Sequence, residues 1–270
     1  MKFFEDPFLI AEAGINHNGS LKKAFQLIDK AKKSGASAIK FQTYKTEKRA
    51  KNNSPIFQIL KKCELNFYDF EKLKKYSDKK KIIFFSTPFD KESVNFLNDI
   101  KVKLFKVSSF DIINNELINE IYKTKKPIIF STGMASLNTI LSLHKKTNYK
   151  KIDHCFLHCV SSYPNKVENS YLKNITFLKK KLLCPVGLSD HTNGIKTSIY
   201  SYILGANIIE KHFMTSEKDK CVDAPVSITP KKFLEMKKTI EEYKEILGKS
   251  KFGIRKEERF AKQFIRKKIY

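Results

Sequence analysis

The sequence predicts an α/β protein built as a single (β/α)8 TIM barrel over residues 1–250. Eight apolar runs alternate with helix-sized segments along the 270 residues. The runs are almost continuously hydrophobic, which is typical of parallel strands covered on both faces. Eight such units in this length predict a closed barrel. A doubly wound open sheet is the alternative, but no GxGxxG follows the first run, which weighs against a dinucleotide-binding form of it.

Hydrophobic periodicity and turn residues place the elements along the chain. Ser20 is a predicted N-cap and Gly35 a stop for the first helix, while Pro230 opens and Gly248 ends the last one. Residues 44–63 are charged and irregular, which predicts an insertion or a long loop. The predicted strands span 8–11, 36–43, 82–85, 104–109, 127–130, 155–159, 186–191 and 208–213. The predicted helices span 20–34, 68–79, 91–97, 115–123, 137–146, 171–180, 194–204 and 230–247.

The chain is strongly basic, with 53 Lys and Arg against 28 Asp and Glu and a net charge of +25. Such a charge can favour nucleic acid, an acidic membrane surface or small anionic substrates. The lysines are scattered over the polar faces of the predicted helices, and Trp is absent while Lys, Asn, Ile and Phe abound, which indicates coding bias and solvated surfaces. No nucleic-acid-binding motif is present, so we expect no nucleic-acid partner.

Composition also bears on the compartment. The five cysteines form an odd count without a CxxC pair, and most lie in apolar runs, which predicts core residues in a reducing compartment. The first seven residues lack the apolar segment of a signal peptide, and no apolar run approaches the length of a membrane span. We therefore expect a cytoplasmic protein that does not associate with membranes.

Two apolar runs near the end of the barrel stop abruptly on a histidine, His191 and His212. One helix-sized segment joins these runs, so their strands should be neighbours in a parallel sheet, with both histidines at the same edge. Neutral imidazole is a common ligand of divalent cations. The pair therefore predicts a metal site, and the alternative is two unrelated polar residues that end two strands.

Nearly every other predicted strand also ends in a polar group, and the carboxyl ends of the strands are where barrel active sites lie. A single strand-end lysine is ordinarily a surface residue, but Lys40 and Lys106 are embedded in apolar sequence. Two lysines among hydroxyls predict a site for phosphate and carboxylate, next to the cation. This combination permits metal activation of a carbonyl beside a bound phosphorylated acid. The strand-end groups are Glu12, Lys40, Thr87, Lys106 with Ser109, Ser131, Tyr163, Ser189 with His191, and His212.

The motifs around these residues resemble those of the sialic acid synthase family, which includes N-acetylneuraminate, legionaminate and pseudaminate synthases. They run in the family's order over nearly the whole chain, from Leu9 to Pro230, and together they are highly specific. The matching segments are 11–19 (AEAGINHNG), 39–43 (IKFQT), 86–90 (STPFD), 131–134 (STGM), 163–164 (YP), 187–192 (GLSDHT) and 210–213 (EKHF).

The resemblance implies a phosphoenolpyruvate-dependent condensation with an N-acetylated aldose, such as N-acetylmannosamine or a diacetamido-trideoxyhexose, to a nine-carbon 2-keto sugar acid. It implies that His191 and His212 hold Mn²⁺ or Mg²⁺ and that Glu12 lies beside the metal as an acid/base or water-positioning group. The residues implied to bind phosphoenolpyruvate are Lys40, Lys106, Ser109, Ser131 and Ser189. Those implied to contact the sugar are Gln42, Thr87, Tyr163 and Asp223.

The chain departs from the family's pattern in two places. The loop before Pro230 keeps Asp223 but has Cys-Val before it and Ala-Pro after it, where many sialate synthases have Gly-Pro and His-Lys, so the identity of the aldose stays open. Residues 251–270 resemble the linker to the family's C-terminal antifreeze-like domain, which we expect to be absent from this chain. Members of this family usually form a homodimer, and whether this chain forms one stays open.

Three other functions remain open from the residues themselves. A Schiff-base aldolase would use Lys40, Lys106 or Lys211 and would be indifferent to chelators. A metal-dependent hydrolase would be built on His17, His191 and His212. A barrel without its lid could also serve as a non-catalytic binding protein.

Overall fold

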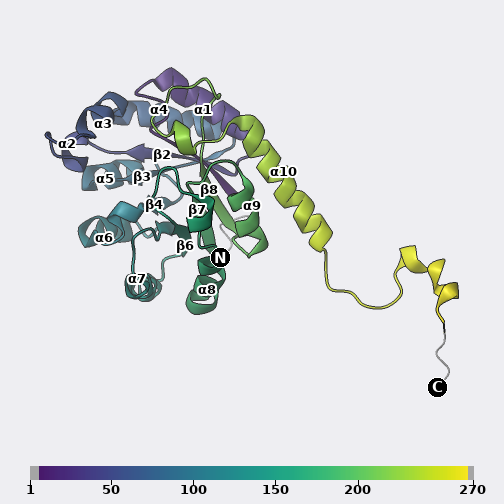
Figure 1. Cartoon of the computed structure of the whole chain (residues 1–270). Coiled ribbons are helices and arrows are strands. Elements are labelled where there is room, and N and C mark those ends of the chain that lie inside the picture. Colours follow the sequence, from purple (N-terminus) through teal and green to yellow (C-terminus); the bar gives the residue numbers. More distant parts are fainter. Residues whose placement is uncertain (1–5, 267–270) are drawn as a thin grey trace.

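The computed structural model describes residues 6–266, and eight parallel strands close into a barrel in strict chain order (Figure 1). This confirms the predicted (β/α)8 fold. Each strand hydrogen-bonds to the next, and β1 pairs with β8 to close the sheet. The strands are β1 (Phe8–Gly14), β2 (Ala38–Thr43), β3 (Ile83–Pro88), β4 (Phe105–Val107), β5 (Ile128–Ser131), β6 (His154–Cys159), β7 (Val186–Asp190) and β8 (Ile208–His212).

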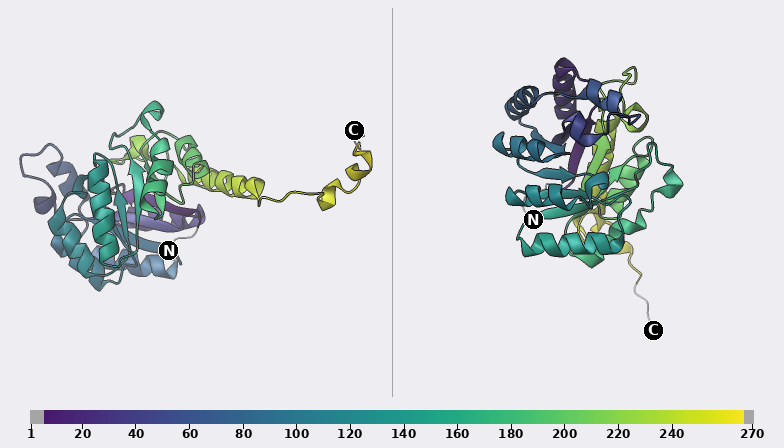
Figure 2. Two further views of the ribbon diagram at one scale, coloured as in Figure 1. Left: turned by 90° about the horizontal axis from the view of Figure 1, so that it is seen from below. Right: turned by 90° about the vertical axis from the view of Figure 1, so that its left-hand side faces the viewer.

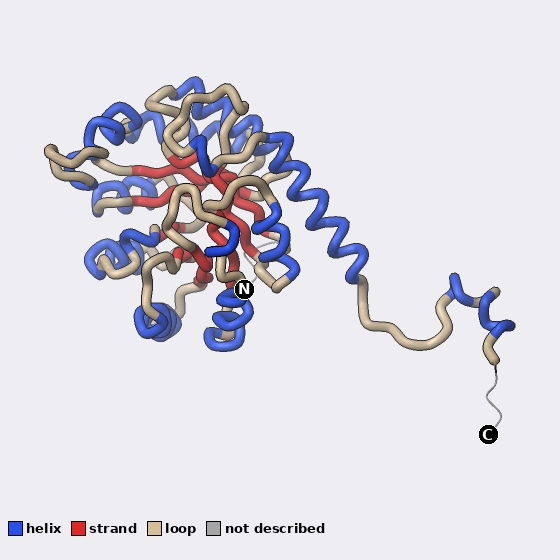
Figure 3. The backbone as a smooth tube through the Cα atoms, viewed as in Figure 1, coloured by secondary structure: helices blue, strands red, loops and turns tan. Residues whose placement is uncertain are grey.

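Helices surround the strands on the outside of the barrel (Figure 3). Several begin at a side-chain N-cap, as the Ser20 prediction required: Ser20 Oγ accepts a hydrogen bond from Lys23 N at 3.3 Å. The helices are α1 (Leu21–Lys33), α2 (Thr46–Arg49), α3 (Phe57–Cys63), α4 (Phe67–Lys79), α5 (Lys91–Asp99), α6 (Asn115–Lys123), α7 (Leu137–Tyr149), α8 (Lys173–Leu182), α9 (Lys196–Ile203) and α10 (Pro230–Leu247).

Strand alternation divides the apolar residues between two cores. One set of side chains points outward and packs under the helices, and Phe41, Phe84 and Phe130 belong to it. The other set points inward and fills the barrel. The inward core consists of Phe8, Ile10, Ala38, Phe85, Leu104, Ile129, Cys155, Leu157 and Ile208. The barrel interior is therefore a packed apolar floor, and the polar groups lie above it.

Residues 44–63 differ from the prediction of an irregular loop. They form α2 and α3, and the Thr46 N–H and hydroxyl both donate to Glu64 Oε2, at 3.1 and 2.7 Å. Short helices of this kind depend on tertiary contacts rather than on intrinsic propensity, so the sequence pattern did not mark them.

The last helix begins at Pro230 and ends before Gly248, as predicted. Its apolar stripe ends at Tyr243, which packs partly against the core, whereas Ile246 is exposed. Residues 248–266 are exposed and extend away from the barrel (Figures 1 and 2). Part of the predicted C-terminal segment, residues 267–270, lies outside the described residues, as do the first five. Within residues 6–266, no helix combines the length and the apolar character needed to cross a membrane.

Candidate active site

A cavity of about 260 Å³ opens at the carboxyl ends of the strands. All twelve side chains predicted for the site from the sequence line it, so the structure brings the complete set together. Strand alternation explains how: inward positions two residues apart on one strand, such as Lys40 and Gln42, stack one above the other over the apolar floor. Barrel closure then places Glu12 of β1 directly beside Lys40 of β2 on one side and His212 of β8 on the other.

The two predicted lysines are buried and share one carboxylate. Lys40 Nζ lies 2.9 Å from Glu12 Oε1 and 3.6 Å from Glu210 Oε1, while Lys106 Nζ lies 3.5 Å from the same Glu210 oxygen. Both lysines are about 3% exposed, so their ammonium groups point into the cavity rather than out to solvent. The charges of the two lysines thus converge on one point.

Hydroxyl groups surround this charged centre. Lys106 Nζ donates to Ser131 Oγ at 2.6 Å and Lys40 Nζ donates to Thr87 Oγ1 at 3.1 Å. Ser189 Oγ donates to Glu210 Oε1 at 3.0 Å. A ring of short hydroxyl side chains leaves room for an anion with several oxygen atoms to replace these internal contacts.

The predicted histidine pair lies at the same mouth, with ring centroids 5.4 Å apart. The Nδ1 atom of His191 is 2.9 Å from Val160 O, which fixes the proton on that nitrogen and leaves Nε2 as an acceptor. The Nδ1 atom of His212 is 3.3 Å from Asp223 Oδ2. The ring of Tyr163 lies over His191 at a centroid distance of 4.0 Å. Two imidazoles and a carboxylate therefore face one space.

Several buried polar atoms at this mouth have no hydrogen-bond partner. They are Glu12 Oε2, Gln42 Oε1 and Glu210 Oε2. A Cβ atom built on Gly14 would lie 3.1 Å from Asp223 Oδ2 and 3.3 Å from Glu12 Oε1, so these carboxylates converge over a position with no side chain of its own. Unsatisfied buried oxygens and nitrogens are costly in a folded protein unless a ligand completes them. The donor set, imidazole nitrogen and carboxylate oxygen, fits a divalent cation and a polar substrate.

The pKa values of the two buried glutamates, Glu12 and Glu210, are shifted in opposite directions. Burial alone would raise the pKa of Glu210, but the charges of Lys106 and Lys40 lower it to about 2. Burial raises the pKa of Glu12, and Lys40 offsets this only in part. Glu210 is thus a permanent counter-ion, whereas Glu12 is the carboxyl group suited to carry a proton.

The cavity residues that the sequence analysis did not name include Glu210, Arg49 and Cys159. Glu210 had a detectable signal, because it lies two residues before His212 on one strand and must share its face. Arg49 belongs to α2, which was predicted as loop, and its guanidinium lies 3.7 Å from the ring centre of Phe89. Cys159 was predicted as a core residue, yet its Sγ lies 3.8 Å from His191 Nδ1 at the cavity wall.

Two residues considered for other reactions lie elsewhere. Lys211 alternates with Glu210 and points out of the barrel, where its Nζ lies 3.3 Å from Asp190 Oδ2 and donates to Thr192 O. The His17 ring is fully buried and its Nδ1 accepts from Gly19 N at 3.1 Å. Neither residue lines the cavity. The structure therefore separates His17 from the histidine pair that the hydrolase alternative required.

Comparison with known proteins identifies the family to which this architecture belongs. The NeuB family model matches residues 27–252. The chain belongs to the NeuB family. An N,N'-diacetyllegionaminic acid synthase of Campylobacter jejuni is 36% identical over 89% of this chain and 77% of that protein. An uncharacterized protein of Methanocaldococcus jannaschii is 41% identical over 90% of this chain and 73% of that protein.

The fold of the chain is also similar to that of a solved structure. The N-acetylneuraminic acid synthetase of Leptospira borgpetersenii, in complex with citrate, superposes with a TM-score of 0.91 at 36% identity. The match covers 96% of this chain and 91% of that chain. The predicted relationship to sialic acid-type synthases is confirmed. Family membership therefore supports a synthase of the sialic acid type.

Proposed function

We propose that this NeuB family member condenses phosphoenolpyruvate with an N-acetylated aldose to a nine-carbon 2-keto sugar acid and releases phosphate. The observation that carries the proposal is the shared centre of Lys40, Lys106 and Glu210 beside the His191–His212 pair. This centre offers two buried ammonium groups to an anion. The two imidazoles beside it can bind a divalent cation next to that anion. N-acetylmannosamine and a 2,4-diacetamido-trideoxyhexose are the acceptors we propose.

The bond changes in this reaction balance without an external oxidant or reductant. The C3 carbon of phosphoenolpyruvate forms a bond to the aldehyde carbon of the open-chain aldose, whose oxygen takes a proton and becomes a hydroxyl. Water adds to C2 of the former enol, and the bond between C2 and the phosphate oxygen breaks. The product keeps a 2-keto acid, and inorganic phosphate leaves.

Lys40 and Lys106 are proposed to bind the phosphate and carboxylate of phosphoenolpyruvate, with Ser109, Ser131 and Ser189 completing the contacts. Their ammonium groups stabilise the charge that develops on the departing phosphate. Glu12 is proposed to position the water molecule and transfer its proton, which agrees with the raised pKa of this carboxyl group.

His191 and His212 are proposed to hold Mn²⁺ or Mg²⁺, with Glu12 and Asp223 close by. A divalent cation there supplies Lewis-acid polarisation of the aldehyde carbonyl. The remaining polar groups at the mouth, Gln42, Thr87, Tyr163 and Asp223, are proposed to contact the sugar.

A phosphate-release assay tests this function. The full-length chain is incubated with phosphoenolpyruvate, Mn²⁺ and a panel of N-acetylated aldoses. We expect EDTA-sensitive release with N-acetylmannosamine or a 2,4-diacetamido-trideoxyhexose, and loss of release in His212→Ala. Absence of release with every aldose would overturn the synthase.

A Schiff-base aldolase is the second candidate, because burial lowers the pKa of Lys106, which is the direction that amine catalysis needs. Lys211 is not available for this role, since it pairs with Asp190 outside the barrel. Borohydride treatment in the presence of substrate separates the two reactions. A covalent adduct on Lys106 together with chelator-resistant activity would establish the aldolase and contradict the synthase.

A further inference from the structure

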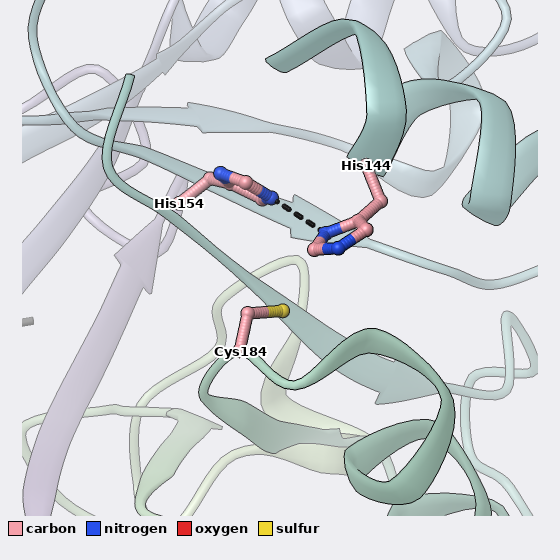
Figure 4. A group of neighbouring side chains, drawn as sticks. All are labelled: His144, His154 and Cys184. Carbon is pink, nitrogen blue, oxygen red and sulfur yellow. Dashed lines mark hydrogen bonds between the residues drawn. The ribbon is translucent and has the colours of Figure 1, made fainter. Parts of the chain in front are cut away.

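Three potential metal ligands gather at the opposite end of the barrel from the candidate active site. His154 begins β6, Cys184 precedes β7, and His144 lies on α7 (Figure 4). Their ligand atoms all lie within 4.8 Å of one another, and within residues 6–266 this is the single group of three or more such ligands. The proposed reaction makes no use of these side chains.

Strand register brings this group together. Phe156 of β6 pairs with Val186 of β7, so His154 and Cys184, each two residues earlier, continue the same row. Both are on the outward face of the sheet, where α7 supplies His144. Figure 4 shows the three side chains turned toward a common space, with the two histidines joined by a hydrogen bond.

The surroundings of both imidazoles suit metal ligation. The Nδ1 atom of His154 lies 2.9 Å from Ile152 O, so this nitrogen carries the proton and Nε2 is left to bind a cation. His144 Nδ1 lies 2.9 Å from that same Nε2 atom, and His144 Nε2 lies 2.9 Å from the amide nitrogen Nδ2 of Asn148. In this arrangement the amide N–H donates to His144 Nε2, and His144 Nδ1 carries the proton. Turning the Asn148 amide over places its oxygen at Nε2, which moves the proton there and frees Nδ1 to bind a metal.

From this arrangement we infer a second metal site, in which His144, His154 and Cys184 bind one Zn²⁺ ion and join α7 to the amino ends of β6 and β7. Zinc takes nitrogen and sulfur ligands in a tetrahedron, with neighbouring ligand atoms about 3.3–3.8 Å apart. The two histidine nitrogens lie 2.9 Å apart, and all three ligand atoms lie within 4.8 Å of one another. His144 and Cys184 are only partly buried, so a water molecule from solvent can complete the fourth position.

The ligand chemistry distinguishes this ion from the cation proposed for the active site. A thiolate with two imidazoles selects Zn²⁺ over Mn²⁺ and Mg²⁺, which favour oxygen ligands. The two sites also lie at opposite ends of the strands. A test that overturns the proposed reaction would therefore leave the inferred zinc site unaffected.

Cobalt replacement tests the site with a readout other than activity. The full-length protein is stripped with a chelator and titrated with Co²⁺, and we expect tetrahedral d–d bands with a thiolate-to-metal charge-transfer band at one equivalent. Cys184→Ser should abolish the charge-transfer band. Cys159→Ser is the matched control, because Cys159 is the cysteine beside the active-site His191 and its loss should leave the band unchanged.

Zinc content after gel filtration provides the second measurement. We expect close to one bound zinc in the wild type and in His191→Ala, and none in His144→Ala, a change at a partly exposed position that leaves the core intact. Asn148→Ala should weaken zinc binding about 10–100-fold, as for other residues that orient a metal-bound histidine. A cobalt band that survives Cys184→Ser, or zinc that disappears with His191→Ala and not with His144→Ala, would overturn the site.

Discussion

At the scale of single residues, Glu210 sets the charge of the cavity. It lies within 3.6 Å of both Lys40 Nζ and Lys106 Nζ, which would otherwise repel each other in a buried space. Because its carboxylate stays ionised, the two ammonium groups are held in place before any substrate arrives. The centre therefore requires little rearrangement when an anion binds.

The role of Lys106 can be tested by substitution. In Lys106→Ala we expect the apparent affinity for phosphoenolpyruvate to fall about 10–100-fold, which is the effect of removing a charged hydrogen-bond donor. Affinity for the aldose should change much less. Steady-state kinetics with each substrate varied in turn measure both, and Lys103→Ala, an exposed position before the same strand, is the control. Equal losses for the two substrates would contradict the assignment.

At the scale of elements, α2 adds a positive charge that the resemblance did not include. Arg49 lies against the rings of Phe89 and Tyr44, at 3.7 and 4.6 Å, and its Nη1 atom is buried without a hydrogen-bond partner. Stacking holds the guanidinium in place at the cavity wall, and the free N–H groups are available to an oxygen atom of a ligand.

We expect Arg49 to contact the acceptor sugar. Arg49→Met keeps much of the apolar volume and removes the donors, so KM for the aldose should rise about 10-fold or more while KM for phosphoenolpyruvate stays within about 3-fold. Lys48→Met, an exposed change on the same helix, should alter neither value. A selective rise in KM for phosphoenolpyruvate would instead place Arg49 in the anion site.

The elements also show which features could be predicted from the sequence and why the other features could not. Lys40, Lys106, His191 and His212 were found because each follows or interrupts an apolar run, and the barrel brings such positions together. The helices α2 and α3 were not found, because four- and seven-residue helices depend on contacts such as those of Glu64 rather than on periodicity. Arg49 was missed together with its helix.

At the scale of the whole molecule, buried neutral histidines couple stability to pH. Burial lowers the pKa of His17 from 6.5 to about 4 and also lowers the pKa of His158. The unfolded chain takes up these protons below about pH 6.5, whereas the folded chain does not until the pH is lower. The free energy of unfolding should therefore be highest above pH 6.5 and fall as the pH drops toward 4.

His17→Gln tests this coupling. For His17 alone the shift corresponds to about 3 kcal/mol between pH 6.5 and 4, and the glutamine removes the titration while keeping an acceptor for Gly19 N. Urea denaturation at both pH values should show a smaller loss of stability in the variant than in the wild type. An identical pH dependence in the two proteins would show that folding does not change the pKa of His17.

The apolar floor of the barrel has one more consequence. Phe8, Phe85 and Leu104 belong to the packed apolar core that fills the barrel below the cavity. The two lysines lie at its bottom, whereas Tyr163, nearly half exposed, lies at the rim. For the proposed synthase, we therefore expect phosphoenolpyruvate to bind at the lysines before the aldose binds at the rim.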